Sequence, residues 1–171
     1  MKKIGLILLI ILLNLNLSFS QTESEIDLLL NGISKTENSI GIVKTKQAEK
    51  IIGFREKSLP ILAEFFTDST LTEIKSECHN RNLTKGELAI IIADRIEGMP
   101  FALLTGVQNC LLEFCKNNPN LIEYYLPWIK QDGGKLFKEK YKNWLASYDR
   151  KSKSERRKEK RKLKRRYKKT E

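Results

Sequence analysis

The chain is poor in the residues from which most metal and nucleophile sites are built. It holds one histidine, His79, and three cysteines in 171 residues, with no glycine-rich phosphate loop and no Ser/His/Asp set. A zinc site needs about four His, Cys or carboxylate ligands at suitable spacing, and the sequence offers no such group. We therefore expect no metal, no cofactor and no catalytic triad.

Long apolar runs are also missing. The longest, Ile4 to Leu13, covers ten residues, well below the roughly 18 of a membrane-spanning helix. Lys2-Lys3 precedes it, and Ser18-Phe19-Ser20 places small residues before a cleavage point. Residues 1–20 are therefore predicted to be a secretory signal peptide cleaved near Gln21, with an uncleaved anchor as the alternative. The mature protein is expected to be periplasmic or secreted.

Length and composition are those of one ordinary globular domain. Hydrophobic residues make up 40% of the chain and aromatic residues 8%. This balance excludes a wholly disordered chain and a multi-pass membrane protein. We expect one helical domain over residues 21–148, followed by a basic tail over residues 149–171.

The formal net charge of +11 belongs almost entirely to that tail. Residues 149–171 hold fourteen Lys and Arg against four Asp and Glu, whereas residues 21–148 carry a net charge of −1. Such a tail attracts anionic polymers or lipid headgroups, without specific nucleic-acid recognition. It has little to bury, so removing Arg150 to Glu171 is expected to leave stability nearly unchanged. The expected polyanion-binding residues are Arg156, Arg157, Lys158, Lys160, Arg161, Lys162, Lys164, Arg165 and Arg166.

Three cysteines in an exported protein favour one disulfide and one spare thiol. Cys78 precedes the central helix, and Cys115 ends an expected antiparallel neighbour, so these two are predicted to pair, with Cys110 as the alternative partner for Cys78. Such a bridge is worth about 3–4 kcal/mol. A metal site and a catalytic cysteine using His79 were the competing interpretations. Structural cysteine is favoured, because adjacent residues rarely face each other correctly.

Helical periodicity extends over the whole mature chain, and no segment alternates cleanly at period two. A polar linker is expected at Ser34 to Gly41 and a polar connection at residues 67–83. The expected helices are Ser24 to Gly32, Thr45 to Phe54, a helix capped by Ser58 with Pro60 in its first turn, a central helix starting near Thr84, Phe101 to about Lys116, Leu121 to Leu126, and one from near Lys135 to Tyr148.

The central helix has the clearest boundary. Thr84 and Glu87 form a capping box, in which each side chain bonds the backbone N–H of the other residue. Leu88 to Ala93 then follow without a polar residue. A helix that is apolar all round is buried all round.

Two segments share a pattern of an apolar helix followed by a proline-led one. They are Gly53…Pro60-Ile61-Leu62 and Gly98…Pro100-Phe101-Ala102, with the prolines 40 residues apart. In this the chain resembles HEAT-like helical hairpins. It also resembles small exported bacterial proteins of unknown function that carry a similar LTKGELAIIIADRI…MP core. The resemblance implies an all-α, compact bundle of two HEAT-like hairpins with flanking helices and a long basic C-terminal helix.

Carboxylates of the central helix are the main catalytic candidates. Glu87, Asp94 and Glu97 occupy nearly one face, where burial can separate the pKa values of paired acids. The competing interpretation is structural, with Glu87 used by the cap and Asp94 paired with Arg95, Arg81 or another base. We favour the structural interpretation.

Aromatic residues near the C-terminus are the main binding candidates. They are Tyr124, Tyr125, Trp128, Phe137, Tyr141 and Trp144. Aromatic residues at helical spacing are usually core, but Trp128 follows Pro127 ahead of a glycine-rich turn. Trp128, Tyr124 and Tyr125 are therefore the expected partner-binding residues.

These observations favour an exported, non-enzymatic helical module that binds a protein or an envelope-surface partner. The alternative is a small cell-envelope hydrolase that uses Asp94 and nearby carboxylates. An open polar cleft at Asp94 favours the enzyme, and a packed ion pair there favours the module.

Overall fold

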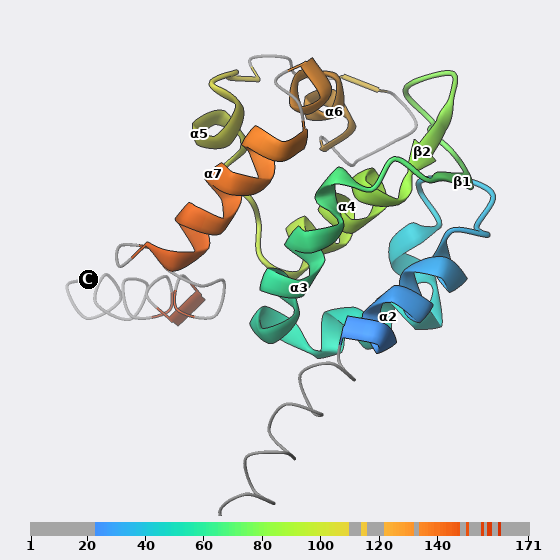
Figure 1. The fold of residues 1–171 in the computed structure, drawn as a ribbon, viewed down its shortest axis with the longest axis horizontal. Helices are drawn as coiled ribbons and strands as arrows, with labels where there is room; N and C mark the ends of the chain where they lie inside the picture. The colour runs from blue at the N-terminus through green and yellow to red at the C-terminus, as the bar shows by residue number, and fades with distance from the viewer. Residues whose placement is uncertain are drawn as a thin grey trace, which may run out of the picture.

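The protein is mostly helical, with one small two-stranded sheet, in the computed structural model (Figure 1). The structure describes residues 23–109, 114–115, 122–131, 134–147 and 150, together with Glu155, Arg157, Lys158 and Arg161. The expected signal peptide, Cys110 and most of the basic tail lie outside these residues. None of the helices in this described part is both long enough and apolar enough to cross a bilayer.

The elements follow one another in a simple order. A helix over residues 23–33, which has no label in Figure 1, comes first. The others are η1 (Ile42–Lys44), α2 (Lys46–Gly53), η2 (Arg55–Ser58), α3 (Leu59–Glu64), η3 (Phe65–Thr67), β1 (Leu71–Lys75), β2 (Asn82–Thr84), α4 (Lys85–Ile96), α5 (Phe101–Thr105), α6 (Ile122–Gln131) and α7 (Gly134–Ala146), where η denotes a 3-10 helix.

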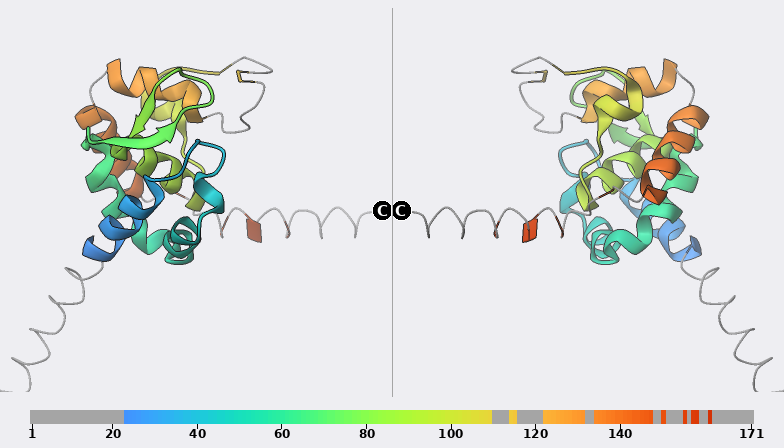
Figure 2. Two further views of the ribbon diagram at one scale, coloured as in Figure 1. Left: turned by 90° about the vertical axis from the view of Figure 1, so that its right-hand side faces the viewer. Right: turned by 90° about the vertical axis from the view of Figure 1, so that its left-hand side faces the viewer.

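Helix α4 is the centre of the domain, as its sequence predicts. Every residue from Leu88 to Ala93 is at most 1% exposed. Helices α2, α3 and α6 and all three 3-10 helices contact it. Figure 1 shows α6 and α7 to one side of α4 and the helix of residues 23–33 with α2 to the other, and Figure 2 gives the same arrangement from two sides.

The first turn of α4 is fastened to the segment before the sheet. The capping box of Thr84 and Glu87 is present, as predicted. The N–H groups of Lys85 and Gly86 donate to the carbonyls of Thr70 (2.8 Å) and Asp68 (2.9 Å). The N–H groups that a helix start leaves unpaired are thus satisfied by neighbouring backbone and by the cap.

Residues 67–83 are not the polar connection expected from the sequence. They contain the antiparallel strands β1 and β2, so the expectation of a strictly all-α fold is wrong. Strand β1 alternates exposed and buried residues, with Thr72 and Ile74 facing inward. The alternating pattern covers only five residues, and one of its two inward residues is the polar Thr72. The Thr72 hydroxyl donates to the Leu83 carbonyl at 2.7 Å.

The opposite edge of β1 pairs with the expected linker. The Lys75 N–H donates to the Glu37 carbonyl, and the Ser39 N–H donates to the Lys75 carbonyl, both at 3.0 Å. Residues 34–39 are therefore held by backbone hydrogen bonds across the domain.

The N-terminal helices follow the prediction closely. Ile26, Leu30 and Ile33 are fully buried on the helix of residues 23–33. Ser58 differs from its expected role, because its hydroxyl donates to the Arg55 carbonyl (2.8 Å) and makes no side-chain cap. Its backbone is already helical, since η2 runs directly into α3.

Two predicted helix bounds in the C-terminal half are wrong. The helix that starts at Phe101 ends at Thr105, not near Lys116, because Gly106 adopts a left-handed conformation (φ 76°) and terminates it. The helix expected to stop at Leu126 continues through Pro127 to Gln131. Helix α7 forms as predicted and buries Phe137 and Tyr141.

We expect Gly86→Ala to lower the free energy of unfolding by about 1–3 kcal/mol, although alanine normally favours a helix. A Cβ at Gly86 would lie 2.6 Å from the Phe66 carbonyl oxygen and 2.9 Å from that of Asp68. Gly53 in α2 is the matched control, because a Cβ there meets nothing within 4 Å. Urea unfolding of both variants measures the difference, and equal midpoints would contradict this account.

Candidate binding pocket

A pocket of about 890 Å³ lies where η3, the start of β1, α4, α6 and α7 come together. The lining residues are up to 73 positions apart in the sequence, from Phe66 to Glu139, so no local pattern encodes the pocket. Its volume falls in the range of sites for small organic ligands.

The floor of the pocket is apolar. Phe66, Ile90, Leu126 and Ile129 line it, and each is at most 5% exposed. The floor is formed by one residue each from η3 and α4 and two from α6.

One wall of the pocket carries a neutralised ion pair. Two guanidinium nitrogens of Arg81 donate to the two carboxylate oxygens of Glu87, at 2.7 and 2.6 Å. This hydrogen bonding raises the pKa of Arg81 above its ordinary value. Glu87 also accepts from the Thr84 N–H (2.8 Å), so cap and ion pair fix the carboxylate together.

The rim of the pocket combines exposed apolar and charged side chains. Leu71 is 72% exposed and Leu136 42% exposed. Lys130, Lys135 and Glu139 line the same rim. Exposed apolar side chains beside an apolar floor are typical of a surface that binds a ligand or a partner.

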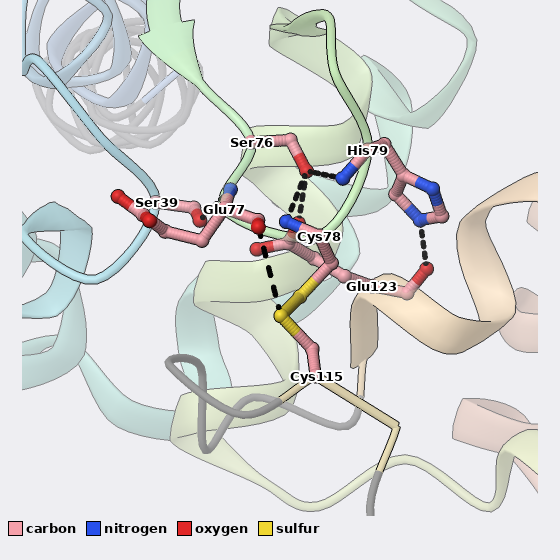
Figure 3. The surroundings of a disulfide bond; sticks show 7 residues. All are labelled: Ser39, Ser76, Glu77, Cys78, His79, Cys115 and Glu123. Carbon is pink, nitrogen blue, oxygen red and sulfur yellow. Dashed lines mark hydrogen bonds between the residues drawn. A yellow bond between two sulfur atoms is a disulfide. The ribbon is translucent and has the colours of Figure 1, made fainter.

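A polar cluster beside the disulfide brings together residues that the sequence analysis did not connect (Figure 3). The Ser76 hydroxyl donates to the carboxylate of fully buried Glu123 and accepts from the N–H groups of Cys78 (3.2 Å) and His79 (2.8 Å). No spacing in the sequence signals this contact, because Ser76 and Glu123 are 47 residues apart.

The imidazole ring of His79 bonds to the backbone of α6 and not to the Ser76 hydroxyl. Its Nε2 lies 2.6 Å from the Glu123 carbonyl oxygen, and a carbonyl only accepts, so Nε2 carries the hydrogen. Pro127 lacks the N–H that would bond this carbonyl four residues earlier in the helix. His79 supplies the missing donor. A catalytic triad needs the histidine between serine and acid, and this arrangement does not have it.

Cys78 and Cys115 lie at disulfide distance, which is the first of the two pairings expected from the sequence. Their sulfur atoms are 2.27 Å apart and their Cα atoms 5.6 Å apart. The bridge attaches the β1–β2 connection to the chain between α5 and α6. Within the described residues, no group of three or more His, Cys, Asp or Glu side chains is placed to hold a metal ion.

The candidate catalytic carboxylates are engaged in structural contacts. Asp94 accepts from the Met99 N–H (2.8 Å), which turns the chain after α4. Glu97 is fully buried and lies 2.7 Å from the Arg150 guanidinium. Arg81 pairs with Glu87 and not with Asp94.

Arg150 therefore packs on the folded domain, which departs at this one residue from the expected tail with almost nothing to bury. Its side chain is 17% exposed, packs 5.4 Å from the ring centre of Trp144 and donates to the Leu145 carbonyl. Neighbouring Tyr141 is fully buried, and burial, followed by the charge of Glu97, raises its pKa. Among the described residues its hydroxyl has no hydrogen-bond partner.

The aromatic candidates separate into core and surface. Tyr125 is buried and stacks on Phe101, with ring centres 4.7 Å apart, so it is a core residue. Tyr124 is half-buried against Phe114. Trp128 is 40% exposed, and neither it nor Tyr124 lines the pocket.

Three of the expected polyanion-binding residues, Arg157, Lys158 and Arg161, are helical and exposed. The other six lie outside the described residues: Arg156, Lys160, Lys162, Lys164, Arg165 and Arg166.

Comparison with protein-family models, with curated proteins and with solved structures gave no match to this chain.

Two truncations test where the domain ends. A chain that ends at Arg150 is expected to unfold at the same urea concentration as the full-length mature protein. A chain that ends at residue 149 is expected to lose about 3 kcal/mol, because it leaves the buried Glu97 carboxylate without its guanidinium. Equal stability of the two truncated proteins would contradict this assignment. The double variant Glu97→Gln/Arg150→Gln should lose less than Arg150→Gln alone.

Proposed function

We propose that the protein is an exported, non-enzymatic binding module whose pocket takes an apolar group of its partner. The pocket carries the proposal. Its buried apolar floor lies beside two exposed leucines, Leu71 and Leu136. Its one internal ion pair, Arg81 with Glu87, is already satisfied. Binding at such a site is favourable mainly because it removes apolar surface from water.

The hydrolase alternative rests on Asp94, and the contacts there favour a structural role. Asp94 bonds the Met99 backbone, Glu97 is in a packed ion pair, and the pocket does not include either residue. The Ser76, His79 and Glu123 cluster also lacks the order of contacts that activates a serine nucleophile.

Two finer expectations accompany this proposal. The disulfide agrees with an oxidising, exported compartment. The likeness to HEAT hairpins applies best to α2 and α3, which pack on α4. It applies less well to α5, which has only five residues.

The pocket is testable with N-phenyl-1-naphthylamine, a neutral probe whose fluorescence rises in apolar surroundings. We expect saturable binding at one site. Ser69→Trp places a large ring on an exposed lining position and should weaken binding by about tenfold, as about 1.4 kcal/mol of lost contact would do.

Thr70→Trp is the matched control for this experiment. Thr70 is the next residue along the chain and is also exposed, but it does not line the pocket. Its probe affinity should equal that of the unmodified protein. Absence of saturable binding, or equal weakening by both tryptophans, would refute the pocket as a ligand site.

The second part of the proposal is that the basic tail holds the protein on anionic polymers or lipid headgroups. Removal of residues 151–171 should lower the salt concentration needed for elution from heparin and flatten its salt dependence, because fewer counterions are released. The variant Lys44→Gln/Lys46→Gln, which removes two exposed charges from the domain, should elute like the unmodified protein. Undiminished retention of the truncated chain would locate the polyanion site in the domain.

A further inference from the structure

A second, polar cavity adjoins the apolar pocket. It measures about 560 Å³ and shares Thr67, Lys135 and Glu139 with its larger neighbour. Its remaining lining residues come from the end of α3 and from α7: Glu64, Lys138, Lys142 and Asn143. The apolar pocket and a cavity lined by charged side chains thus lie side by side, with Thr67, Lys135 and Glu139 between them.

The charges of the polar cavity do not balance. Lys138 and Lys142 both bind Glu64, each at 2.7 Å, so one carboxylate faces two ammonium groups. Their hydrogen bonds lower the pKa of Glu64, which keeps it ionised. Lys135 offsets Glu139, and the cavity keeps an excess of one positive charge. Lys130 on the rim of the apolar pocket is balanced by Asp68, which lines the same pocket.

The charges inside the apolar pocket, in contrast, are neutralised. Arg81 and Glu87 form a two-bond ion pair, and Asp68 accepts from the Thr70 N–H while lying 3.9 Å from the Lys85 ammonium group. A ligand that fits both compartments therefore has an uncharged apolar part and a negatively charged end.

From this arrangement, and resting on the proposed function of the pocket, we infer that the ligand is a single-chain amphiphile with an anionic headgroup. Its hydrocarbon chain lies on the floor formed by Phe66, Ile90 and Leu126, and its headgroup lies in the polar cavity beside Lys135. The chain contributes most of the affinity by leaving water. The lysines select the sign of the headgroup.

Displacement of N-phenyl-1-naphthylamine from the full-length mature protein by three ten-carbon amphiphiles tests the inference. The three are decanoate, 1-decanol and decyltrimethylammonium, each used below its micellar concentration. Decanoate should displace the probe at a concentration about fivefold lower than decanol, and the cation should be the weakest. The preference should shrink as salt is added, because Lys135 and Lys142 are exposed to solvent.

Lys135→Gln should remove most of the preference for decanoate while leaving decanol unchanged. Lys140→Gln is the matched control, since Lys140 lies on the same helix and lines neither cavity. Lys135→Glu should reverse the order and favour the cation. An unchanged preference in both Lys135 variants would overturn the assignment of the headgroup site.

Two further arms separate the ways in which this inference can fail. Decyl phosphate should compete like decanoate, because the proposed site recognises a negative headgroup on one chain. The protein should not sediment with neutral vesicles of dioleoylphosphatidylcholine, and sedimentation with them together with no displacement of the probe by decanoate would refute a monomeric ligand. Probe binding with equal competition by all three ten-carbon ligands would refute the headgroup inference only. No probe binding at all would refute the pocket.

Discussion

The structure depends on one constraint, which is that α4 must be covered on every side. Its residues from Leu88 to Ala93 leave no face for water, and each large side chain contributes about 1.5–3 kcal/mol by burial. A single layer of helices cannot enclose such a rod. The chain therefore surrounds α4 with short elements from both halves of the sequence, and the apolar pocket lies where η3, α6 and α7 meet around it.

Buried and half-buried charges fasten these short elements to the centre. Lys85 at the start of α4 reaches Asp27 on the first helix, and its ammonium group lies 5.3 Å from the ring centre of Phe65. Glu97, just after the end of α4, receives Arg150 from beyond α7. These pairs are costly to break, because Lys85 and Glu97 are buried and each would lose an oppositely charged partner. These two ion pairs connect α4 to the first helix and to the chain after α7.

The connection between β1 and β2 plays the same part for α6. Ser76 binds the buried Glu123 carboxylate, His79 binds the carbonyl that Pro127 leaves unpaired, and Cys78 joins Cys115. Two contacts at Glu123 thus hold a proline-containing helix against the domain, and the disulfide holds the chain between α5 and α6. Because α6 supplies Leu126 and Ile129 to the floor of the pocket, this cluster supports the proposed binding site without contacting a ligand.

The sequence by itself determined the features whose signals are local. They are the capping box of α4, its complete burial, the apolar stripe of α7 and the location of the net charge in residues 149–171. It also favoured the Cys78 and Cys115 pairing, although the helix expected to end near Cys115 already ends at Thr105. Only the tertiary structure decided the β1–β2 sheet, the passage of α6 through Pro127 and the inclusion of Arg150 in the domain. Each of these depends on a partner far away in the chain, such as Glu97 for Arg150 or His79 for the Glu123 carbonyl. Periodicity and capping report hydrogen bonds and burial within a few residues, so they carry no information on contacts that form only when distant segments meet. The pocket belongs to the same class, since its lining comes from residues 66 to 139.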